Sequence, residues 1–291
     1  MKREQRGSPE GKDAGFARLD VLLRDGDRTA NAEAIAEEVP IALEYNGIAH
    51  AVMFATPLDL EDFARGFTLS ESIALSPSEI YGIEVEEPEA SGVKVAIEIA
   101  SERFLLLKDR RRALTGRTGC GLCGTESLEH AVRDLQPLTT ELSLNTRDVT
   151  AALVELRARQ TLMLATGAVH AAGWMDARGH LTTVREDVGR HNALDKLLGA
   201  LIAAGTDLSS GAALITSRAS FEMVQKAVTL GVPVLAAVSA PTALAVRMAR
   251  QANLTLLGFV RAEHYSCYSA PHRLRDAELP RQTTAAVVHP A

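Results

Sequence analysis

The chain has 291 residues, of which 46% are hydrophobic and only 4% aromatic, and its formal net charge is -6 at pH 7. This length allows a sizeable core and two domains, whereas the negative charge argues against nucleic acid as a partner. No apolar run reaches the length of about 18 residues that a membrane span needs. With no secretory signal and only three cysteines, we expect a cytoplasmic protein with reduced thiols.

The first part of the chain is predicted to be a polar tail followed by an α+β module. Residues 1–37 form the tail and lead-in, and residues 38–115 form the module. Within the module, apolar and polar side chains alternate over residues 39–56 around Asn46-Gly47. Asn-Gly supplies the positive φ angles of a tight hairpin turn, so this stretch is predicted to be a β-hairpin.

The rest of the module is predicted to hold one helix and two strands. Thr56 is the expected helix cap and Pro57 the first-turn residue. Strands are expected around Ile83 and Val95, where apolar residues alternate with polar ones. The inner face of the helix is predicted to carry Leu60, Phe63, Ala64 and Phe67.

Two cysteines lie together in a Cys-x-x-Cys motif, Cys120 and Cys123, surrounded by glycines. Little side-chain bulk shields their sulfurs, so residues 116–125 are predicted to be a mobile, reactive loop. A cluster of cations upstream would lower the pKa of a thiol and so favour its reactive thiolate. The cations are Lys108, Arg110, Arg111, Arg112 and Arg117.

The Cys-x-x-Cys motif and the basic cluster each allow several interpretations. The motif could be half of a zinc site, although no second pair at ligand spacing is evident. It could also be a thioredoxin-like redox pair, a structural disulfide, or a pair that carries sulfur. The basic cluster is either a solvated helix face or a docking surface for phosphates or an acidic partner.

Residues 126–270 are predicted to form a second, α/β domain, and residues 271–291 a C-terminal tail. From residue 161 onward, strands alternate with helices, which favours a mixed, largely parallel sheet with right-handed crossovers. Ligands usually bind at the carboxyl ends of such strands, so three loops are expected to share one rim: residues 217–220, 239–242 and 260–265. The predicted strands cover residues 162–166, 170–175, 181–184, 213–216, 234–238 and 254–260, and the predicted helices cover residues 147–159, 192–203, 221–230 and the stretch after Ser239, its expected cap.

A dense group of polar residues lies between a predicted strand and the start of a helix. Backbone N–H groups and the helix dipole favour an anion at such a position. The alternative is a helix entrance with Asp187 as cap and with solvated Arg/Asp pairs. Together with two residues at another strand end, the group suggests a phosphate-bearing ligand. The candidates are Asp187, Arg190, His191, Asn192, Lys196, Ser217 and Arg218.

Three motifs give the chain a resemblance to a known family. They are RTGCGLCG at residues 117–124, VREDVGRHNALDKLLG at residues 184–199, and TSRASFE at residues 216–222. The chain resembles the FdhD family, the accessory sulfurtransferases of formate dehydrogenase. The resemblance implies that the protein accepts persulfide sulfur from a cysteine desulfurase. It then delivers the sulfur to the molybdenum cofactor, bis-molybdopterin guanine dinucleotide, that formate dehydrogenase requires.

The resemblance also implies roles for individual residues. Cys120 matches the family's persulfide cysteine, and Cys123 matches the second cysteine of the pair. The cofactor is a bound substrate, and no permanently bound metal is implied. The fold of the second domain is similar to that of cytidine deaminases, and a homodimer is expected. The segment that matches the family's cofactor-binding segment is Phe259, Val260, Arg261, Ala262, Glu263 and His264.

Deaminase chemistry does not carry over from that fold. Zinc deaminases need His-x-Glu and a later Pro-Cys-x-x-Cys, whereas here His170 is followed by two alanines and the cysteine pair comes earlier in the chain. His170 is therefore interpreted as a core or rim residue, and the single Cys267 as a small buried hydrophobe. Two rival functions stay open: a nucleotide-binding chaperone that shelters the cofactor, and a zinc-dependent hydrolase.

Overall fold

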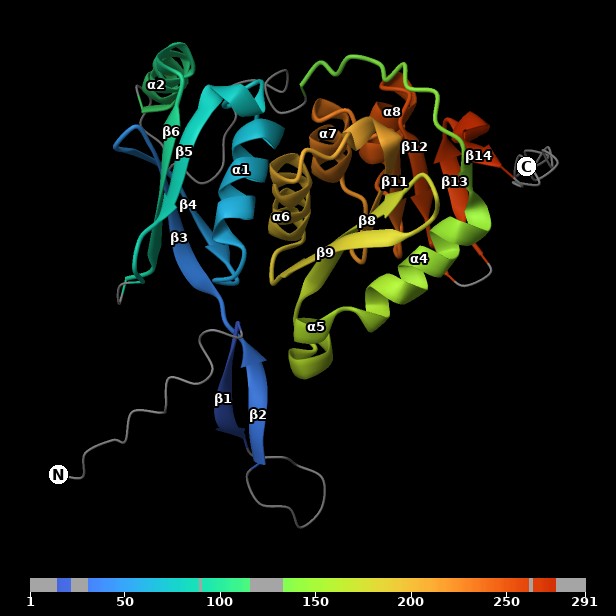
Figure 1. Cartoon of the computed structure of the whole chain (residues 1–291), viewed down its shortest axis with the longest axis horizontal. Helices are drawn as coiled ribbons and strands as arrows, with labels where there is room; N and C mark the ends of the chain where they lie inside the picture. Colours follow the sequence, from blue (N-terminus) through green and yellow to red (C-terminus); the bar gives the residue numbers. More distant parts are fainter. Residues whose placement is uncertain (1–14, 22–30, 89–90, 116–132, 262–263, 276–291) are drawn as a thin grey trace, which may run out of the picture.

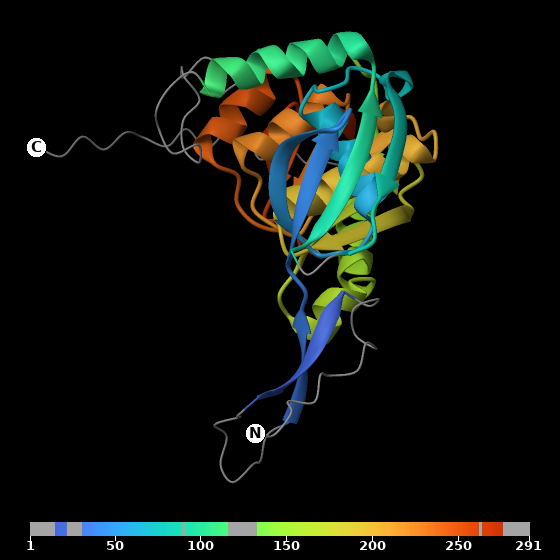
Figure 2. The same ribbon diagram turned by 90° about the vertical axis from the view of Figure 1, so that its left-hand side faces the viewer.

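The computed structural model describes residues 15–21, 31–88, 91–115, 133–261 and 264–275 (Figure 1). Its N-terminal sheet has the order β4-β3-β6-β5, in which β3 and β6 are parallel and the other pairs antiparallel. Helix α1 covers one face of this sheet, and α2 follows β6 (Figure 2). The elements are β3 (Val39–Tyr45), β4 (Ile48–Ala55), α1 (Leu60–Ser70), β5 (Ile80–Val85), β6 (Val93–Ile99) and α2 (Ser101–Thr115).

The predicted hairpin and helix face of this region are confirmed. Asn46 and Gly47 have φ angles of 47° and 78° and form the turn between β3 and β4. The predicted inner face of α1 is buried against β3 and β6. The predicted cap is wrong, because Asp59 is the residue that precedes α1. Thr56 is instead buried and bonded to the far half of the chain.

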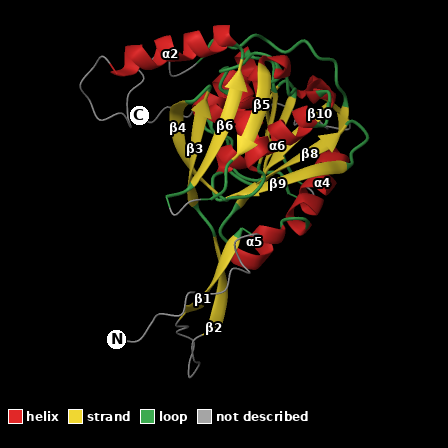
Figure 3. Cartoon of the chain, turned by 60° about the vertical axis from the view of Figure 1, so that its left-hand side comes forward, coloured by secondary structure: helices red, strands yellow, loops and turns green. Residues whose placement is uncertain are grey.

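The predicted N-terminal tail contains a hairpin that the sequence analysis missed. Strands β1 (Phe16–Val21) and β2 (Asn31–Ala36) pair antiparallel. The hairpin extends away from the body, near the short helix α5 (Thr161–Thr166) (Figure 3). Its many polar and small residues do not reveal a strand, because the hairpin contributes little to a core. Residues 1–14 lie outside the described part of the chain.

The second sheet has the order β13-β12-β11-β10-β8-β9. The neighbouring pairs β10–β11 and β11–β12 are parallel, whereas the pairs β8–β9, β8–β10 and β12–β13 are antiparallel. The sheet is therefore mixed as predicted but not largely parallel, because β8 and β9 form a hairpin and β13 returns beside β12 without a crossover helix. The strands are β8 (His170–Asp176), β9 (Leu181–Asp187), β10 (Gly211–Ile215), β11 (Val234–Ala237), β12 (Thr255–Gly258) and β13 (Ser266–Ser269).

Helices cover both faces of the second sheet. One buried cluster lies between the sheet and α6, α7 and α8, and a second cluster lies between the sheet and α4. These packed faces confirm the helices that periodicity predicted, although α8 is capped by Thr242 and not by Ser239. The helices are α4 (Thr146–Ala158), α6 (Arg190–Ala203), α7 (Phe221–Thr229) and α8 (Ala243–Gln251). Among the described residues, we find no helix with the length and apolarity to cross a membrane.

One predicted element in this region is wrong, and the first residues of the expected C-terminal tail have secondary structure. The expected strand at residues 162–166 is α5, whose first N–H groups donate to the Glu186 carboxylate on β9, at 2.8 Å from Leu162 and 2.9 Å from Met163. The expected C-terminal tail begins with a 3-10 turn and strand β14 (Leu274–Arg275), which pairs with β7 (Leu144–Asn145). Arg273 in that turn is fully buried and donates to backbone carbonyls.

The two sheets meet through α1 and α6, which lie side by side between them (Figure 1). A Cβ atom added to Gly66 would lie 1.8 Å from the Asp195 carbonyl oxygen, and one added to Gly199 would lie 1.9 Å from the Asp62 carbonyl oxygen. The two helix backbones are therefore in direct contact, and only glycine fits at these points. We call this contact, with the end of β4 and the adjoining part of α7, the seam. The predicted domain boundaries stay a prediction.

Candidate functional site

Several connections meet at one edge of the second sheet, where β8 begins and β9 to β12 end. Backbone contacts join them: the Thr242 N–H donates to the Ala219 carbonyl at 3.0 Å, and the Phe259 N–H donates to the Ser239 carbonyl at 3.2 Å. The shared edge expected from the sequence is thus present among the described residues. We call residues 189–191, 216–220, 238–242 and 259–261 the rim.

The rim presents cationic and aromatic side chains to solvent. Arg218 and Arg261 are exposed, and the Arg190 Nε is buried without a hydrogen-bond partner. Phe259 is 42% exposed, and its φ of 53° is unusual for a bulky residue. Ser217 is buried, with its hydroxyl 3.1 Å from the Arg218 carbonyl. The rim can therefore offer guanidinium groups to an anion and a ring face to a planar group.

A cavity of about 630 Å³ adjoins the rim. Its volume lies in the usual range for small-molecule sites, about 300–1,000 Å³. It is lined in part by α4 and α5, which the sequence analysis did not connect with the site. Gln160 in this lining is buried, with only 4% of its surface exposed. The lining includes Arg157, Gln160, Met163, His170, Thr216 and Val238.

Two histidines lie at this edge: His170 is the first residue of β8, and His191 is the second residue of α6. Burial lowers the pKa of His170, and the nearby Arg190 lowers it further. Burial also lowers the pKa of His191, against the opposing effect of the Glu222 carboxylate, which lies 2.8 Å from the His191 Nε2. Both shifts favour neutral imidazoles near pH 7. His170 lines the cavity beside the rim and is only partly buried, in agreement with the interpretation of this histidine as a rim residue.

Three predicted cofactor residues lie instead within the seam. The Lys196 Nζ is 2.7 Å from Asp187 Oδ2, and both side chains have 0% exposure. Lys196 also donates to the Thr56 carbonyl at 3.0 Å, and the Asn192 amide donates to the Phe54 carbonyl at 2.9 Å. The alternative of a helix entrance with solvated Arg/Asp pairs does not describe Lys196 and Asp187, which form a buried pair. The role of these residues as cofactor ligands stays a prediction, and their described contacts join β4 to α6.

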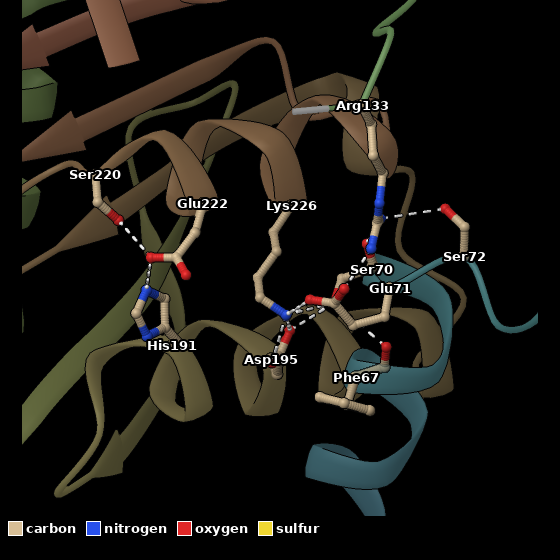
Figure 4. A network of polar contacts seen from close by, with 10 residues as sticks. All are labelled: Phe67, Ser70, Glu71, Ser72, Arg133, His191, Asp195, Ser220, Glu222 and Lys226. Carbon is tan, nitrogen blue, oxygen red and sulfur yellow. Dashed lines mark hydrogen bonds and ion pairs between the residues drawn. The ribbon is translucent and has the colours of Figure 1, made fainter. Parts of the chain in front are cut away.

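A second polar network crosses the seam and was not predicted (Figure 4). The Lys226 Nζ lies 2.9 Å from Asp195 Oδ2 and 2.7 Å from Glu71 Oε1. The Ser70 hydroxyl donates to Asp195 at 2.7 Å. Glu71 also pairs with Arg133. The sequence alone could not reveal this network, because its members are up to 156 residues apart.

The predicted sulfur chemistry falls outside the described residues. Cys120 and Cys123 lie there, as do Ala262 and Glu263 of the predicted cofactor segment. Cys267 on β13 is exposed, so the expectation of a buried hydrophobe is wrong for it, although partial burial raises the pKa of its thiol. Within the described ranges, no cluster of three or more His, Cys, Asp or Glu side chains could hold a metal ion.

The comparisons with known proteins now decide the family. The model described as "FdhD/NarQ family" matches residues 36–275. The chain belongs to this family. A relative from Cupriavidus necator named "Sulfur carrier protein FdhD" is 59% identical over 252 residues, which is 87% of each chain. A relative of the same name from Bordetella bronchiseptica is 54% identical over 256 residues, 87% of this chain and 92% of its own.

Fold comparison agrees with the family assignment. A crystal structure described as a formate dehydrogenase accessory protein, from Desulfotalea psychrophila, covers 90% of this chain and 100% of its own, with a TM-score of 0.73. At 24% identity it supports the mixed α/β fold alone. The stretch matched by the FdhD/NarQ model includes the cysteine pair, the rim and the segment at residues 259–264. The family resemblance seen in the sequence is thereby confirmed.

Proposed function

We propose that this chain is a sulfur carrier for formate dehydrogenase that takes persulfide sulfur onto Cys120 and passes it to the molybdenum cofactor. The observation that carries the proposal is membership of the FdhD/NarQ family, with relatives above 50% identity named sulfur carrier proteins. The matched stretch contains the Cys-x-x-Cys motif. The cysteine desulfurase as donor, catalysis of the transfer, a homodimer and a cytoplasmic location are parts of the same proposal.

The loading step follows from thiol chemistry. The Cys120 thiolate attacks the outer sulfur of a persulfide on the desulfurase. One sulfur–sulfur bond breaks and one forms, and the donor cysteine leaves as a thiolate. The exchange needs no external oxidant or reductant. The upstream Lys and Arg residues would favour the attacking thiolate.

Cys123 has two possible roles in delivery. As a relay, it accepts the outer sulfur of the Cys120 persulfide by the same exchange. As a resolving residue, its thiolate attacks the Cys120 sulfur and expels hydrosulfide, which becomes the metal ligand of the substrate cofactor. The two thiols are then oxidised to a disulfide, which a cellular thiol reduces before the next round.

The rim and its cavity are the proposed binding site for the guanine dinucleotide of the cofactor. Exposed Arg218 and Arg261 would contact phosphates. The Phe259 ring would stack on a base. The cavity beside His170 would accept one end of the elongated anion. That the second domain is cytidine-deaminase-like, as the family resemblance in the sequence implies, is likewise a proposal.

A second candidate is a chaperone that shelters the cofactor without transferring sulfur. The rim and cavity offer cationic, aromatic and buried polar groups to a nucleotide, and cofactor binding alone would be compatible with them. The two candidates differ in whether sulfur is bound covalently. They agree on nucleotide binding at the rim.

Intact-mass analysis distinguishes these candidates. The protein is incubated with an active cysteine desulfurase and cysteine, then weighed before and after reduction. A carrier gains one sulfur, about 32 Da, which reductant removes. Cys120→Ala should abolish the gain, and Cys267→Ala is the matched control that should retain it. No gain in the wild type would favour the sheltering chaperone.

A further inference from the structure

Gln160 is a buried glutamine in the connection between α4 and α5 (Figure 1). Only 4% of its surface is exposed. Its side chain makes no capping hydrogen bond to α5, and its amide has no hydrogen-bond partner among the described residues. Polar groups that are buried this deeply are nearly always hydrogen-bonded. The amide therefore retains the capacity to bind a ligand.

Helix α5 is anchored without the help of this amide. The N–H groups of Leu162 and Met163 donate to the Glu186 carboxylate, at 2.8 and 2.9 Å. The Leu164 N–H donates to the backbone carbonyl of Gln160 at 2.9 Å. The start of the helix thus has its acceptors already, and a capping role does not account for a buried glutamine at this position.

Gln160 lines the cavity of about 630 Å³ beside the rim, and two other polar side chains without partners line it as well. Arg157, in the last turn of α4, is exposed and makes no ion pair with any residue that the structure describes. His170, at the start of β8, makes no hydrogen bond through its ring within the same part of the chain. A few polar groups among apolar ones are typical of a site for a small molecule. The apolar lining includes Met163, Val169 and Val238.

A glutamine amide is complementary to one particular edge of a heterocycle. Its NH2 group donates to a ring carbonyl oxygen while its own oxygen accepts from the adjacent ring N–H, so two hydrogen bonds form side by side. We call a ring carbonyl with an adjacent N–H the lactam edge. Guanine presents this edge through O6 and N1–H, and a pterin ring presents the same arrangement. The cofactor proposed for this chain contains both rings.

We propose that Gln160 is a specificity-determining residue, which binds the lactam edge of a guanine or pterin ring inside the cavity. The inference rests on the proposed function and deepens it, because it assigns one side chain to one edge of the cofactor. Binding would satisfy an amide that folding alone leaves without a partner. A ring without the lactam edge would leave the amide unpaired in the complex, which is how buried polar groups reject the wrong ligand.

The test titrates two nucleotides into the wild type and into Gln160→Met by calorimetry. Guanosine diphosphate and 1-methylguanosine diphosphate differ only in the proton or methyl group on N1, and methionine retains the unbranched chain without the amide. We expect the wild type to bind the methylated nucleotide about tenfold more weakly than guanosine diphosphate. Gln160→Met should bind guanosine diphosphate about tenfold more weakly than the wild type does, and should bind both nucleotides equally.

A third ligand, pterin-6-carboxylate, distinguishes the two sources of the lactam edge. If the cavity binds the guanine ring, the dependence on the Gln160 amide is found with the nucleotides. If the cavity binds the pterin ring, the wild type and Gln160→Met differ about tenfold for pterin-6-carboxylate and bind guanosine diphosphate equally. Either result supports the assignment of the lactam edge to Gln160.

Gln225 on α7 provides a matched control. It is also a buried glutamine, with 8% exposure, but its side-chain oxygen accepts a hydrogen bond from the Arg133 N–H at 3.1 Å. Gln225→Met should lower the melting temperature by about 2–4 °C and leave the affinity for all three ligands unchanged. Gln160→Met should not lower the melting temperature, because the amide that it removes has no partner in the folded chain. Gln160→Leu carries the same expectations if the methionine variant folds poorly.

Two results would overturn the inference. One is an unchanged affinity for guanosine diphosphate and for pterin-6-carboxylate in the Gln160 variants. The other is equal weakening of both nucleotides together with a lower melting temperature, which is the signature of a purely structural glutamine. Sulfur loading is measured separately by intact mass. A wild-type chain that gains no sulfur but shows binding that depends on the amide would overturn the carrier function alone, so the two failures are distinguishable.

Discussion

Helix α6 contributes its first residues to the rim and the residues one turn later to the seam. Arg190 and His191 lie at the rim, where Arg190 has an unpartnered nitrogen and His191 meets a half-exposed carboxylate. Asp195 and Lys196, on the same helix, are almost fully buried and paired with Lys226 and Asp187. Similar residue types thus occupy two very different environments within seven residues.

This difference shows that a polar motif cannot be assigned to one role as a unit. At the rim, charged groups retain the exposure that a ligand needs. At the seam, each charge is committed to a partner, because an unpaired buried charge is costly. Charge alone therefore does not identify binding residues; its accessibility does.

The largest expected difference between the seam and the rim is in the free energy of unfolding. Lys196→Ala leaves Asp187 buried without its cation and should lower the free energy of unfolding by about 3–5 kcal/mol. Arg218→Ala at the exposed rim should change it by less than about 0.5 kcal/mol. Urea unfolding at pH 7 measures both. Equal losses in the two variants would contradict the division between seam and rim.

The second largest loss of stability is expected from a change at the backbone contact between α1 and α6. Gly199→Ala places a methyl group against the Asp62 carbonyl and should lower stability by about 1–3 kcal/mol or more. Gly82→Ala is the control, because its nearest atom beyond its chain neighbours is a side-chain oxygen at 3.9 Å. Thermal unfolding of both variants checks the prediction. A Gly199 variant as stable as the Gly82 variant would mean that the helices separate easily.

Local chemistry made part of the fold predictable. The Asn46-Gly47 turn needs no tertiary information, since its positive φ angles follow from residue type. The faces of α1 and α7 follow from helical periodicity. In contrast, α5 has only six residues, and its first turn is satisfied by Glu186 from a strand that comes later in the chain. Such partners are invisible to a local reading.

The site was predictable to a similar extent. The strand ends located the rim, because parallel strands place their carboxyl ends at one edge. The cavity lining from α4 and α5 was missed because residues 162–166 were interpreted as a strand. The burial of Lys196 was missed because it depends on Thr56, which lies 140 residues earlier. No pattern within residues 184–199 indicates which cations remain exposed.

Nucleotide binding is expected to depend on the rim and not on exposed arginines elsewhere on the sheet. Arg218→Ala should weaken binding of guanosine diphosphate about tenfold, since a hydrogen bond to a charged group is worth about 1.5 kcal/mol. Arg178→Ala is the control, because Arg178 is exposed at the β8–β9 turn on the opposite edge of the sheet. Calorimetric titration measures both affinities. Equal weakening by the two variants would place the nucleotide away from the rim.

The smallest expected effect is a pH dependence from the rim histidines. Burial lowers the pKa of His170 and of His191 in the folded state. The unfolded chain therefore binds more protons below about pH 6.5, and these groups lower stability as pH falls from 7 to 5.5. Glu222→Gln removes the carboxylate that favours protonated His191 and should steepen this decline, as measured by urea unfolding at both pH values. A shallower decline in Glu222→Gln would contradict the assigned contact.

The most direct test of sulfur delivery follows labelled sulfur to its destination. The protein is loaded by a desulfurase with [35S]cysteine, freed of donor, and mixed with inactive formate dehydrogenase that contains its molybdenum cofactor. We expect label in the extracted cofactor and a rise in formate oxidation in proportion to it, with neither in Cys120→Ala. Activation by the wild type without transfer of label to the cofactor would contradict the account and favour a sheltering chaperone.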